Sequence, residues 1–264
     1  MNYINEIAEV LSNKEIAKNI YSAILKSPEI AKTSKPGQFI NILPNKNWEK
    51  AMRRPMSLAG TDGNNIEIIY KVFGEGTRLI SNWKNKDRID IIGPLGNYWK
   101  VSKKKPVLIG GGVGIAPIMY LSNYLNKIKQ NHICIMGARD SSEHFLEHNP
   151  DKNIILSTDD GSLGIKGNVV DALRNIPLDN QEIHIYSCGP PVMMENIKKY
   201  AELNKIDCQV ALETIMACGF GICQGCTVEY NEDSKQEHSY RNKFGLACLD
   251  GPVFDAKEIK TCKL

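Results

Sequence analysis

The sequence predicts a β-barrel followed by an α/β domain and a small cysteine-rich C-terminal lobe. Residues 1 to about 100 contain short apolar segments punctuated by Gly and Pro, whereas residues 106 to about 212 alternate apolar strands with helical stretches. Three cysteines then follow within nine residues. A chain of 264 residues exceeds the usual single-domain size. We expect domain boundaries at 1–102, 103–212 and 213–264.

Composition excludes several classes of protein. The chain has 33 basic and 30 acidic residues and no basic stripe, so we do not expect it to bind nucleic acid. No run of 18 apolar residues occurs, so we expect no transmembrane helix and no membrane partner. The first residues lack the pattern of a signal peptide. Eight cysteines without an export signal indicate a reducing, cytoplasmic location and a metal cluster instead of a disulfide framework.

The N-terminal third predicts six short strands. Residues 7–11 and 20–25 form the first two, with breaks expected at Ser12-Asn13-Lys14 and Ser27-Pro28. The others are expected at 38–42, 56–59, 66–72 and 88–92. Strands of this length and spacing, separated by turn residues, are typical of a closed antiparallel barrel.

The middle of the chain predicts a parallel sheet. Residues 106–109 form a continuous apolar strand, which leads through a glycine turn into a helix near Pro117 to Lys129. Further strands are expected at 132–136, 153–156, 182–186 and 208–212. Strands that alternate with helices in this way indicate a parallel sheet covered by helices on both faces.

The glycine turn runs Gly110-Gly111-Gly112-Val113-Gly114-Ile115-Ala116-Pro117. Glycines let the backbone approach a pyrophosphate, and the N-terminus of the following helix supplies N–H groups and a positive dipole. Ile115 stands in the last position of the pattern G-x-G-x-x-G, so the ordinary Rossmann fingerprint fails. The turn by itself leaves two interpretations open, a dinucleotide site or a tight strand-to-helix connection.

The cysteines 218, 223 and 226 have the C-x4-C-x2-C spacing of plant-type 2Fe–2S ligation. Cys248 is the expected fourth ligand, because residues 227–230 and a segment near Ser239-Tyr240 predict two strands around a turn that returns Cys248 to the loop. Cys262 is its rival, in a C-terminal tail expected to fray. A structural zinc site, which prefers paired C-x2-C knuckles, and a disulfide are the alternatives. Cys134 and Cys208 are expected in the core.

Several motifs occur together in a recognisable order. They are Arg54-Pro55-Met56-Ser57, Gly74-Glu75-Gly76-Thr77, the glycine turn, Ser187-Cys188-Gly189-Pro190, the four cysteines 218, 223, 226 and 248, and Asp250-Gly251-Pro252-Val253-Phe254. This order resembles the ferredoxin–NADP reductase superfamily. With the cysteines, nearly all of the chain is similar to the electron-transfer subunits of class B, NAD-dependent dihydroorotate dehydrogenase.

The resemblance implies that the N-terminal barrel binds FAD. Arg54 would pair with the FAD pyrophosphate and Ser57 would hydrogen-bond near flavin N5, with Pro55 and the Met56 backbone between them. Ile69, Tyr70 and Lys71 match a second flavin-contacting strand, and Gly76 and Thr77 would close over the pyrophosphate by backbone and hydroxyl donors. The alternatives are a solvated pair Arg53-Arg54 and a plain hairpin turn at Gly76-Thr77.

The resemblance also implies a dinucleotide site in the α/β domain, formed by Gly110, Gly111, Gly112, Gly114, Asp159, Cys188, Gly189 and Pro190. Cys188 would face the nicotinamide, and with Ser57 it is our predicted catalytic position. The alternatives are a buried thiol at Cys188 and a solvated acidic turn at Asp159. Arg139 beside Asp140 offers a poor site for a ribose 2′-phosphate, so we expect NADH and not NADPH.

Electron counting gives the expected mechanism. NADH delivers two electrons, a 2Fe–2S cluster accepts one at a time, and a flavin converts between the two. No pocket for a further organic substrate is evident, so electrons pass to or from another protein. The family implies an FMN-containing catalytic subunit that oxidises dihydroorotate to orotate in pyrimidine biosynthesis, within a hetero-oligomer. The alternatives are the equivalent subunit of a bifurcating transhydrogenase, sulfide dehydrogenase or hydrogenase, or a zinc-stapled nucleotide-binding regulator without turnover.

Overall fold

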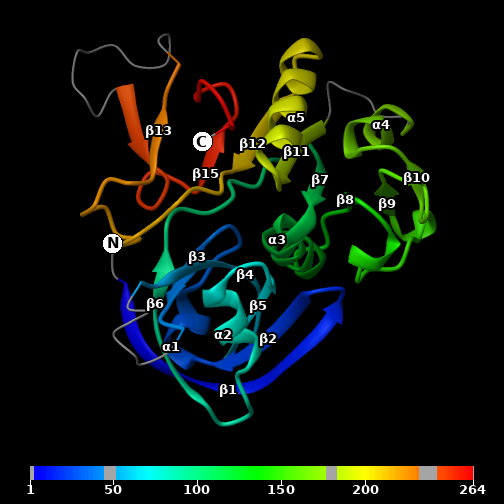
Figure 1. The fold of residues 1–264 in the computed structure, drawn as a ribbon. Coiled ribbons are helices and arrows are strands. Elements are labelled where there is room, and N and C mark those ends of the chain that lie inside the picture. The colour runs from blue at the N-terminus through cyan, green and yellow to red at the C-terminus, as the bar shows by residue number, and fades with distance from the viewer. Residues whose placement is uncertain (1–2, 45–51, 177–182, 232–242, 264) are drawn as a thin grey trace.

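A computed structural model describes residues 3–44, 52–176, 183–231 and 243–263. The barrel occupies one end of the molecule, and the α/β domain and the C-terminal lobe lie beside each other on top of it (Figure 1). Among the described residues, no helix has both the length and the apolar character needed to cross a membrane.

Six antiparallel strands close the barrel in the order β1-β2-β5-β4-β3-β6, which confirms the prediction. They span β1 Ile4–Ala17, β2 Ile20–Lys26, β3 Phe39–Ile42, β4 Arg54–Asp62, β5 Asn65–Lys71 and β6 Arg88–Leu95. The helices α1 Pro28–Thr33 and α2 Glu75–Ser81 connect strands of the barrel. The barrel interior is filled by aliphatic side chains, among them Ile40, Ile42, Leu58, Ile66 and Ile68.

The expected break at Ser12-Asn13-Lys14 is wrong, because β1 runs through it. Two register irregularities, between Val10 and Ser12 and between Glu15 and Ala17, let the long strand stay paired with β2. Asn13 is tolerated because its side chain is paired: Nδ2 donates to the Ile80 carbonyl at 2.9 Å, and Oδ1 accepts from the Tyr70 hydroxyl at 2.8 Å.

The α/β domain is a seven-stranded sheet in the order β10-β9-β8-β7-β11-β12-β15. Its strands are β7 Lys105–Gly111, β8 Ile133–Ala138, β9 Ile154–Thr158, β10 Ile165–Lys166, β11 Ile183–Cys188, β12 Asp207–Ala211 and β15 Val253–Asp255. The first six are parallel; five of them were predicted and the two-residue β10 was not, and β15 adds an antiparallel edge through the pair Ala211–Val253. The expected boundary at 212/213 stays a prediction.

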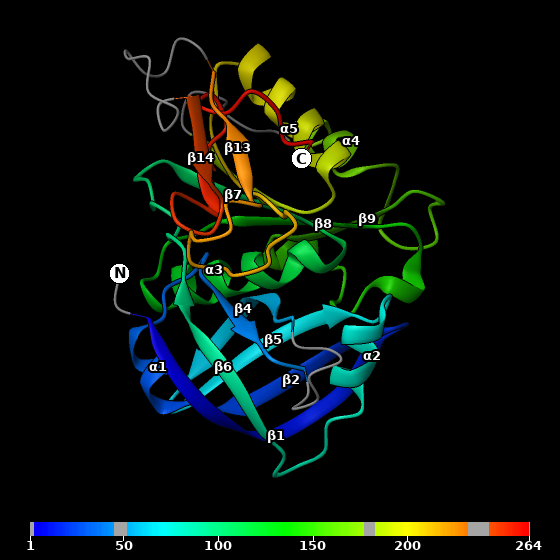
Figure 2. The ribbon, with the colours of Figure 1, turned by 60° about the vertical axis from the view of Figure 1, so that its left-hand side comes forward.

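Helices cover both faces of this sheet, as the alternation predicted. Leu108 of β7 packs among residues of α3 Ile115–Lys127, whereas its neighbours Val107 and Ile109 pack with α4 Val169–Arg174 and α5 Pro191–Leu203 on the opposite face. Helix α3 also packs against β4, so it lies between the sheet and the barrel (Figure 2).

The C-terminal lobe contains the predicted hairpin. Strand β13 Thr227–Glu229 pairs antiparallel with β14 Phe244–Leu246. The segment Ser239-Tyr240, where the return strand was expected, lies outside the described residues. Cys226 immediately precedes the first strand and Cys248 lies two residues after the end of the second, so the hairpin brings the two cysteines together.

Candidate functional site

The first candidate site is a cavity of about 500 Å³ between the barrel and the α/β domain. Strand β4 begins with Arg54-Pro55-Met56-Ser57, and β5 ends with Ile69-Tyr70-Lys71. Every residue predicted on the flavin side lines this cavity, namely Arg54, Pro55, Met56, Ser57, Ile69, Tyr70, Lys71, Gly76 and Thr77. The prediction therefore selected residues that the fold brings together, while their contacts with FAD stay a prediction.

The two consecutive arginines lie in different environments. Arg53 Nη2 forms an ion pair with Asp90 Oδ1 at 2.8 Å, and its side chain is 18% exposed. Arg54 lines the cavity, and its Nη1 donates to the Met52 carbonyl at 2.6 Å. A Cβ atom on Gly76 would collide with the Arg54 guanidinium, so glycine makes room for the arginine there. These positions favour a binding role for Arg54 over a solvated basic pair.

Thr77 departs from its expected role as a hydroxyl donor. Its Oγ1 accepts from the backbone N–H groups of Phe73 at 3.1 Å and Gly74 at 3.2 Å, and it donates to the Gly74 carbonyl at 3.0 Å. The hydroxyl thus caps α2. Because Gly76 and Thr77 lie in the first turn of that helix, the alternative of a hairpin turn is wrong.

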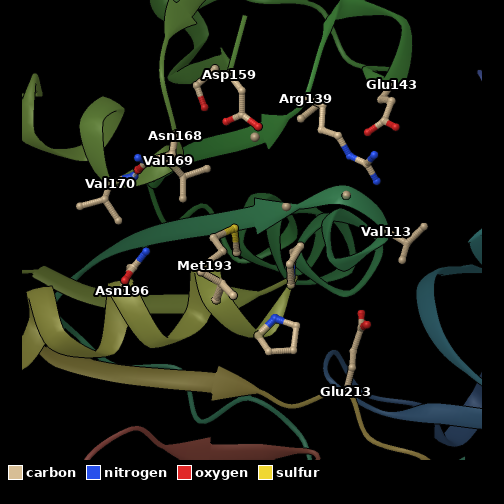
Figure 3. A pocket seen from close by; sticks show the side chains of 18 of the residues that line it. Val113, Arg139, Glu143, Asp159, Asn168, Val169, Val170, Met193, Asn196 and Glu213 are labelled. Atoms are coloured by element: carbon tan, nitrogen blue, oxygen red, sulfur yellow. Dashed lines mark hydrogen bonds between the residues drawn. The ribbon is translucent and has the colours of Figure 1, made fainter. Parts of the chain in front are cut away.

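A second cavity of about 770 Å³ opens at the carboxyl ends of the parallel strands (Figure 3). This edge is where open α/β sheets bind their ligands. Four of the eight residues predicted for the dinucleotide line it: Gly111, Gly112, Asp159 and Pro190. The other four, Gly110, Gly114, Cys188 and Gly189, are not part of the lining.

Close backbone packing explains the glycines that do not line the second cavity. Cys188 ends β11 and pairs in register with Gly110 of β7. A Cβ on Gly114 would collide with the Cys188 carbonyl, so the glycine lets the turn seat against this strand end. Burial raises the pKa of the Cys188 thiol well above its ordinary value, and the Glu213 carboxylate raises it further. Cys188 therefore stays a neutral thiol, which suits positioning and not nucleophilic attack.

The loop after β8 also differs from expectation. Asp140, expected to repel a 2′-phosphate, is not part of the cavity lining. Its carboxylate instead accepts from Ser142 N at 2.8 Å and from Ser142 Oγ at 2.5 Å, and so caps a short helical turn. Arg139 does line the cavity, and the acid near it is Glu143 (Figure 3). The Glu143 carboxylate is itself ion-paired with Lys71 Nζ at 2.6 Å, so the expected choice of NADH over NADPH stays a prediction.

Sequence reasoning missed Glu213, which lines both cavities together with Lys71 and Val113. Its side chain is exposed toward the cavities, yet the surrounding protein partly desolvates it and raises its pKa. Its carboxyl group therefore lies where the two sites meet. A signal was present in the sequence, because Glu213 lies just beyond the apolar strand at 208–212, on the sheet edge that binds ligands.

The four predicted cluster cysteines gather as two pairs. Cys226 Sγ lies 3.1 Å from Cys248 Sγ, and the Cys223 N–H donates to Cys218 Sγ at 3.4 Å. Gly219 and Gly221 have φ of +82° and +86°, which lets the loop fold around its thiols. No group of three His, Cys, Asp or Glu side chains in the described part could hold a single metal ion. Two pairs suit a two-iron cluster, in which the ligands divide between the irons.

Thiolate character is favoured at two of these positions. Burial raises the pKa of Cys218, but hydrogen bonds from the loop backbone outweigh burial and bring it to about 7. The hydrogen bond with Cys248 lowers the pKa of Cys226 to about 6, and the same interaction raises the pKa of Cys248. The pair therefore shares one proton. Metal ligation requires deprotonated thiols, so the loop is suited to it.

Cys262 is not positioned as a cluster ligand. It is buried beside α5, where its N–H donates to Glu195 Oε2 at 2.9 Å, and Thr261 Oγ1 donates to the same carboxylate at 3.0 Å. The expectation that the tail frays is therefore wrong for these residues, because this carboxylate anchors them. All eight cysteines are free thiols, with Cys134 and Cys208 buried as expected.

Known proteins share this arrangement. Residues 213–260 match the iron-sulfur cluster binding domain of dihydroorotate dehydrogenase B, and residues 108–199 match the oxidoreductase NAD-binding domain. The electron transfer subunit of dihydroorotate dehydrogenase B (NAD(+)) from Bacillus velezensis is 33% identical over 258 residues, covering 95% of this chain and 96% of that protein. The chain belongs to the family of dihydroorotate dehydrogenase B electron transfer subunits.

Further comparisons agree with this family. The same subunit from Fusobacterium nucleatum subsp. nucleatum is 34% identical, covering 97% of this chain and 98% of that protein. A solved structure of an NADH-dependent reduced ferredoxin-NADP oxidoreductase, studied for flavin-based electron bifurcation, has a TM-score of 0.82 and 28% identity over 98% of this chain and 91% of that chain. The FAD/NAD-binding domain of nitric oxide dioxygenase from Vibrio cholerae (TM-score 0.67, 21% identity, 77% and 97% coverage) shares the fold.

Members of this family are oxidoreductase subunits with FAD, NAD and a 2Fe–2S cluster, and the residues present in this chain suit all three. The four cysteines predicted as cluster ligands lie in two pairs. A cation and an apolar wall line the first cavity, and glycines line the second. The match to an iron-sulfur domain favours the cluster over the zinc alternative.

Proposed function

We propose that this chain passes electrons between NAD(H) and an FMN-containing dihydroorotate dehydrogenase catalytic subunit, through FAD in the first cavity and the cluster at the cysteine loop. The observation that carries the proposal is the continuity of the three sites. Lys71, Val113 and Glu213 line both cavities, so a dinucleotide and a flavin would meet there. Met216 lines the flavin cavity and lies two residues before Cys218.

Bound FAD would supply the conversion between a two-electron hydride and single electrons. The chain's own residues have separate tasks in this proposal. Arg54 holds the FAD pyrophosphate, Ser57 lies near the flavin ring, and Cys188 supports the nicotinamide position from behind. Glu213 places a carboxyl group where the two cavities meet. Gly111, Gly112, Asp159 and Pro190 hold the dinucleotide.

The surface beside the cysteine loop supports a protein partner. Ile215 and Ile222 are 85% and 76% exposed, and Cys223 is also exposed. On the same loop, Phe220 stacks on Tyr3 with ring centroids 5.8 Å apart. Large apolar side chains exposed next to a redox group suit the face of a partner that exchanges electrons with it. We assign this face to the catalytic subunit, in a cytoplasmic hetero-oligomer of pyrimidine biosynthesis.

The test combines the purified chain, the catalytic subunit from the same organism, dihydroorotate and NAD⁺ under anaerobic conditions. We expect NADH to form, and we expect NADH added to the chain alone to bleach the flavin and to produce the EPR signal of a reduced cluster. Failure of dihydroorotate to reduce NAD⁺ in the reconstituted complex contradicts the proposal.

A subunit of a bifurcating oxidoreductase is the second candidate, supported by the solved structure with 28% identity and a TM-score of 0.82. Reduction of ferredoxin by a nicotinamide nucleotide that requires a second acceptor, in the absence of dihydroorotate, would favour that candidate. The same preparation serves both measurements.

A further inference from the structure

The short strand β3 separates the barrel core from the cluster lobe. Ile40 and Ile42 point into the barrel core, as the alternation of a strand requires. Phe39 lies on the opposite face, in the core group that contains Cys226 and Cys248, and it also lines the flavin cavity. Asn41 follows Phe39 by two residues and therefore shares its face. This face of β3 lies between the flavin cavity and the cysteines.

Asn41 is fully buried there, with 0% exposure. Its Nδ2 donates to the backbone carbonyl of Cys218 at 2.9 Å, across a separation of 177 residues in the chain. A Cβ atom on Gly219 would lie 2.7 Å from the same Nδ2. The backbone of the first cluster cysteine and its neighbour is thus seated directly on the Asn41 amide.

Packing alone does not account for an asparagine in this position. A buried amide is costly unless it is paired, and a leucine would fill a similar volume without polar atoms. Asn41 Oδ1 is buried and has no hydrogen-bond partner among the described residues. Rotating the amide by 180° would place this oxygen against the Cys218 carbonyl, so the donor orientation is the one the site accepts.

Asn41 is also held firmly on its barrel side. It pairs in register with Pro55 of β4, a residue that lines the flavin cavity. Arg53 Nη1 donates to the Asn41 carbonyl at 3.3 Å and to the Asp90 carbonyl at 3.2 Å. One residue therefore joins the flavin-binding strands to the backbone of the cluster loop.

We propose that Asn41 is a positioning residue that fixes the Cys218 end of the cluster loop against the flavin barrel. This inference rests on the proposed function, in which single electrons pass between the reduced flavin and the cluster. Asn41 exchanges no electron and no proton. It holds constant the separation between the two groups, on which the rate of electron transfer depends steeply.

The test uses the full chain loaded with FAD and cluster, and the variant Asn41→Leu. Under anaerobic conditions, NADH is mixed with the protein while flavin bleaching and the reduced-cluster EPR signal are followed separately. We expect cluster reduction to slow about tenfold, or the cluster content to fall by a similar factor, because groups that orient metal ligands typically have effects of this size. Flavin bleaching by NADH should keep its rate.

Gln209→Leu is the matched control, because Gln209 is also a buried amide whose Nε2 donates to a backbone carbonyl, that of Lys100 at 2.8 Å. It should leave cluster content, EPR signal and cluster reduction unchanged. If Asn41→Leu loses FAD as well as the cluster, Asn41→Asp is used instead. This variant keeps the side-chain size and replaces the N–H donor by an acceptor, and the same measurements on it test the positioning role.

Wild-type rates and an unaltered EPR signal in the Asn41 variant overturn the inference and leave the proposed function intact. If NADH bleaches the flavin of the wild-type chain and no cluster signal ever forms, the proposed function fails and the inference with it. Iron content and EPR line shape are measured without turnover, so they report on the position of the loop independently of activity.

Discussion

Lys71 Nζ and Glu143 Oε1 lie 2.6 Å apart and join the barrel to the α/β domain. Lys71 lines both cavities and Glu143 lines the dinucleotide cavity, so the ion pair spans the place where the two domains meet. A second link lies beside it, in which the Lys18 N–H donates to the Ser142 carbonyl at 3.0 Å. The loop that follows β8 therefore belongs to the dinucleotide cavity and is anchored on the flavin barrel.

We predict that Glu143→Gln relaxes the preference for NADH. Removing this carboxylate frees Lys71 from its ion pair and leaves Arg139 without its neighbouring acid, so the cavity becomes more positive and a ribose 2′-phosphate meets less repulsion. The ratio of kcat/KM with NADPH to that with NADH should rise about tenfold, equivalent to about 1.4 kcal/mol. Asp140→Asn is the control, because Asp140 lies outside the cavity lining and should leave the ratio unchanged. Steady-state reduction of an artificial acceptor with each nucleotide measures this ratio of kcat/KM values.

We predict that Cys248→Ser abolishes or severely perturbs the 2Fe–2S EPR signal, because Cys248 Sγ lies 3.1 Å from Cys226 Sγ. Cys262→Ser should leave the signal intact, since Cys262 is buried against α5 next to Glu195. Iron content after anaerobic reconstitution provides a second measurement. The opposite pattern would show that the ligand assignment is wrong.

We predict that Arg54→Ala weakens FAD retention by about tenfold or more, because a charge-assisted contact with a pyrophosphate contributes about 1.5–3 kcal/mol. Equilibrium binding of FAD to the deflavinated protein measures the change. Arg88→Ala is the control, because Arg88 is exposed at the start of β6 and is not part of the cavity lining. Equal FAD affinity in wild type and Arg54→Ala removes the proposed role.

We predict that Glu213→Gln changes the pH dependence of stability. Partial desolvation by the surrounding protein raises the pKa of Glu213 in the folded chain, so the native state binds this proton more tightly than the unfolded state. The contribution of protonated Glu213 to the free energy of unfolding is therefore fully present below the ordinary carboxyl pKa. It is lost as pH rises through the native pKa. Compared with wild type, Glu213→Gln should gain stability as pH rises through that range. Denaturant midpoints across pH measure this, and parallel curves would contradict it.

The barrel and the sheet were predictable because their signals are local. Short apolar segments between turn residues define the strands of both. The break expected in β1 was wrong because Asn13 finds hydrogen-bond partners within the fold. These partners, Ile80 and Tyr70, come from distant parts of the chain. A sequence pattern places residues along a strand, but it does not show which polar side chain finds a buried partner.

The candidate site was likewise predictable only in part: the sequence located its residues but not the directions of their side chains. Nine flavin-side residues come from two strands and one helix start, and motifs located them because neighbouring strand ends meet in one cavity. Side-chain direction was not predictable. Asp140 and Arg139 are adjacent, yet the carboxylate caps a turn and the guanidinium enters the cavity. Thr77 likewise uses its hydroxyl within its own helix start. Such outcomes depend on local hydrogen bonds that compete with a ligand.

The chain leaves the sheet after β12, forms the cysteine loop and its hairpin, and returns as β15 directly beside β12. Near this point, the Leu212 N–H donates to the Pro252 carbonyl at 2.9 Å. The cluster lobe is therefore an insertion between two adjacent strands and has no single flexible tether. It is not built to swing between an electron donor and an acceptor as a mobile carrier does. The cluster lobe therefore keeps one position, and the partner protein must dock beside it to exchange electrons.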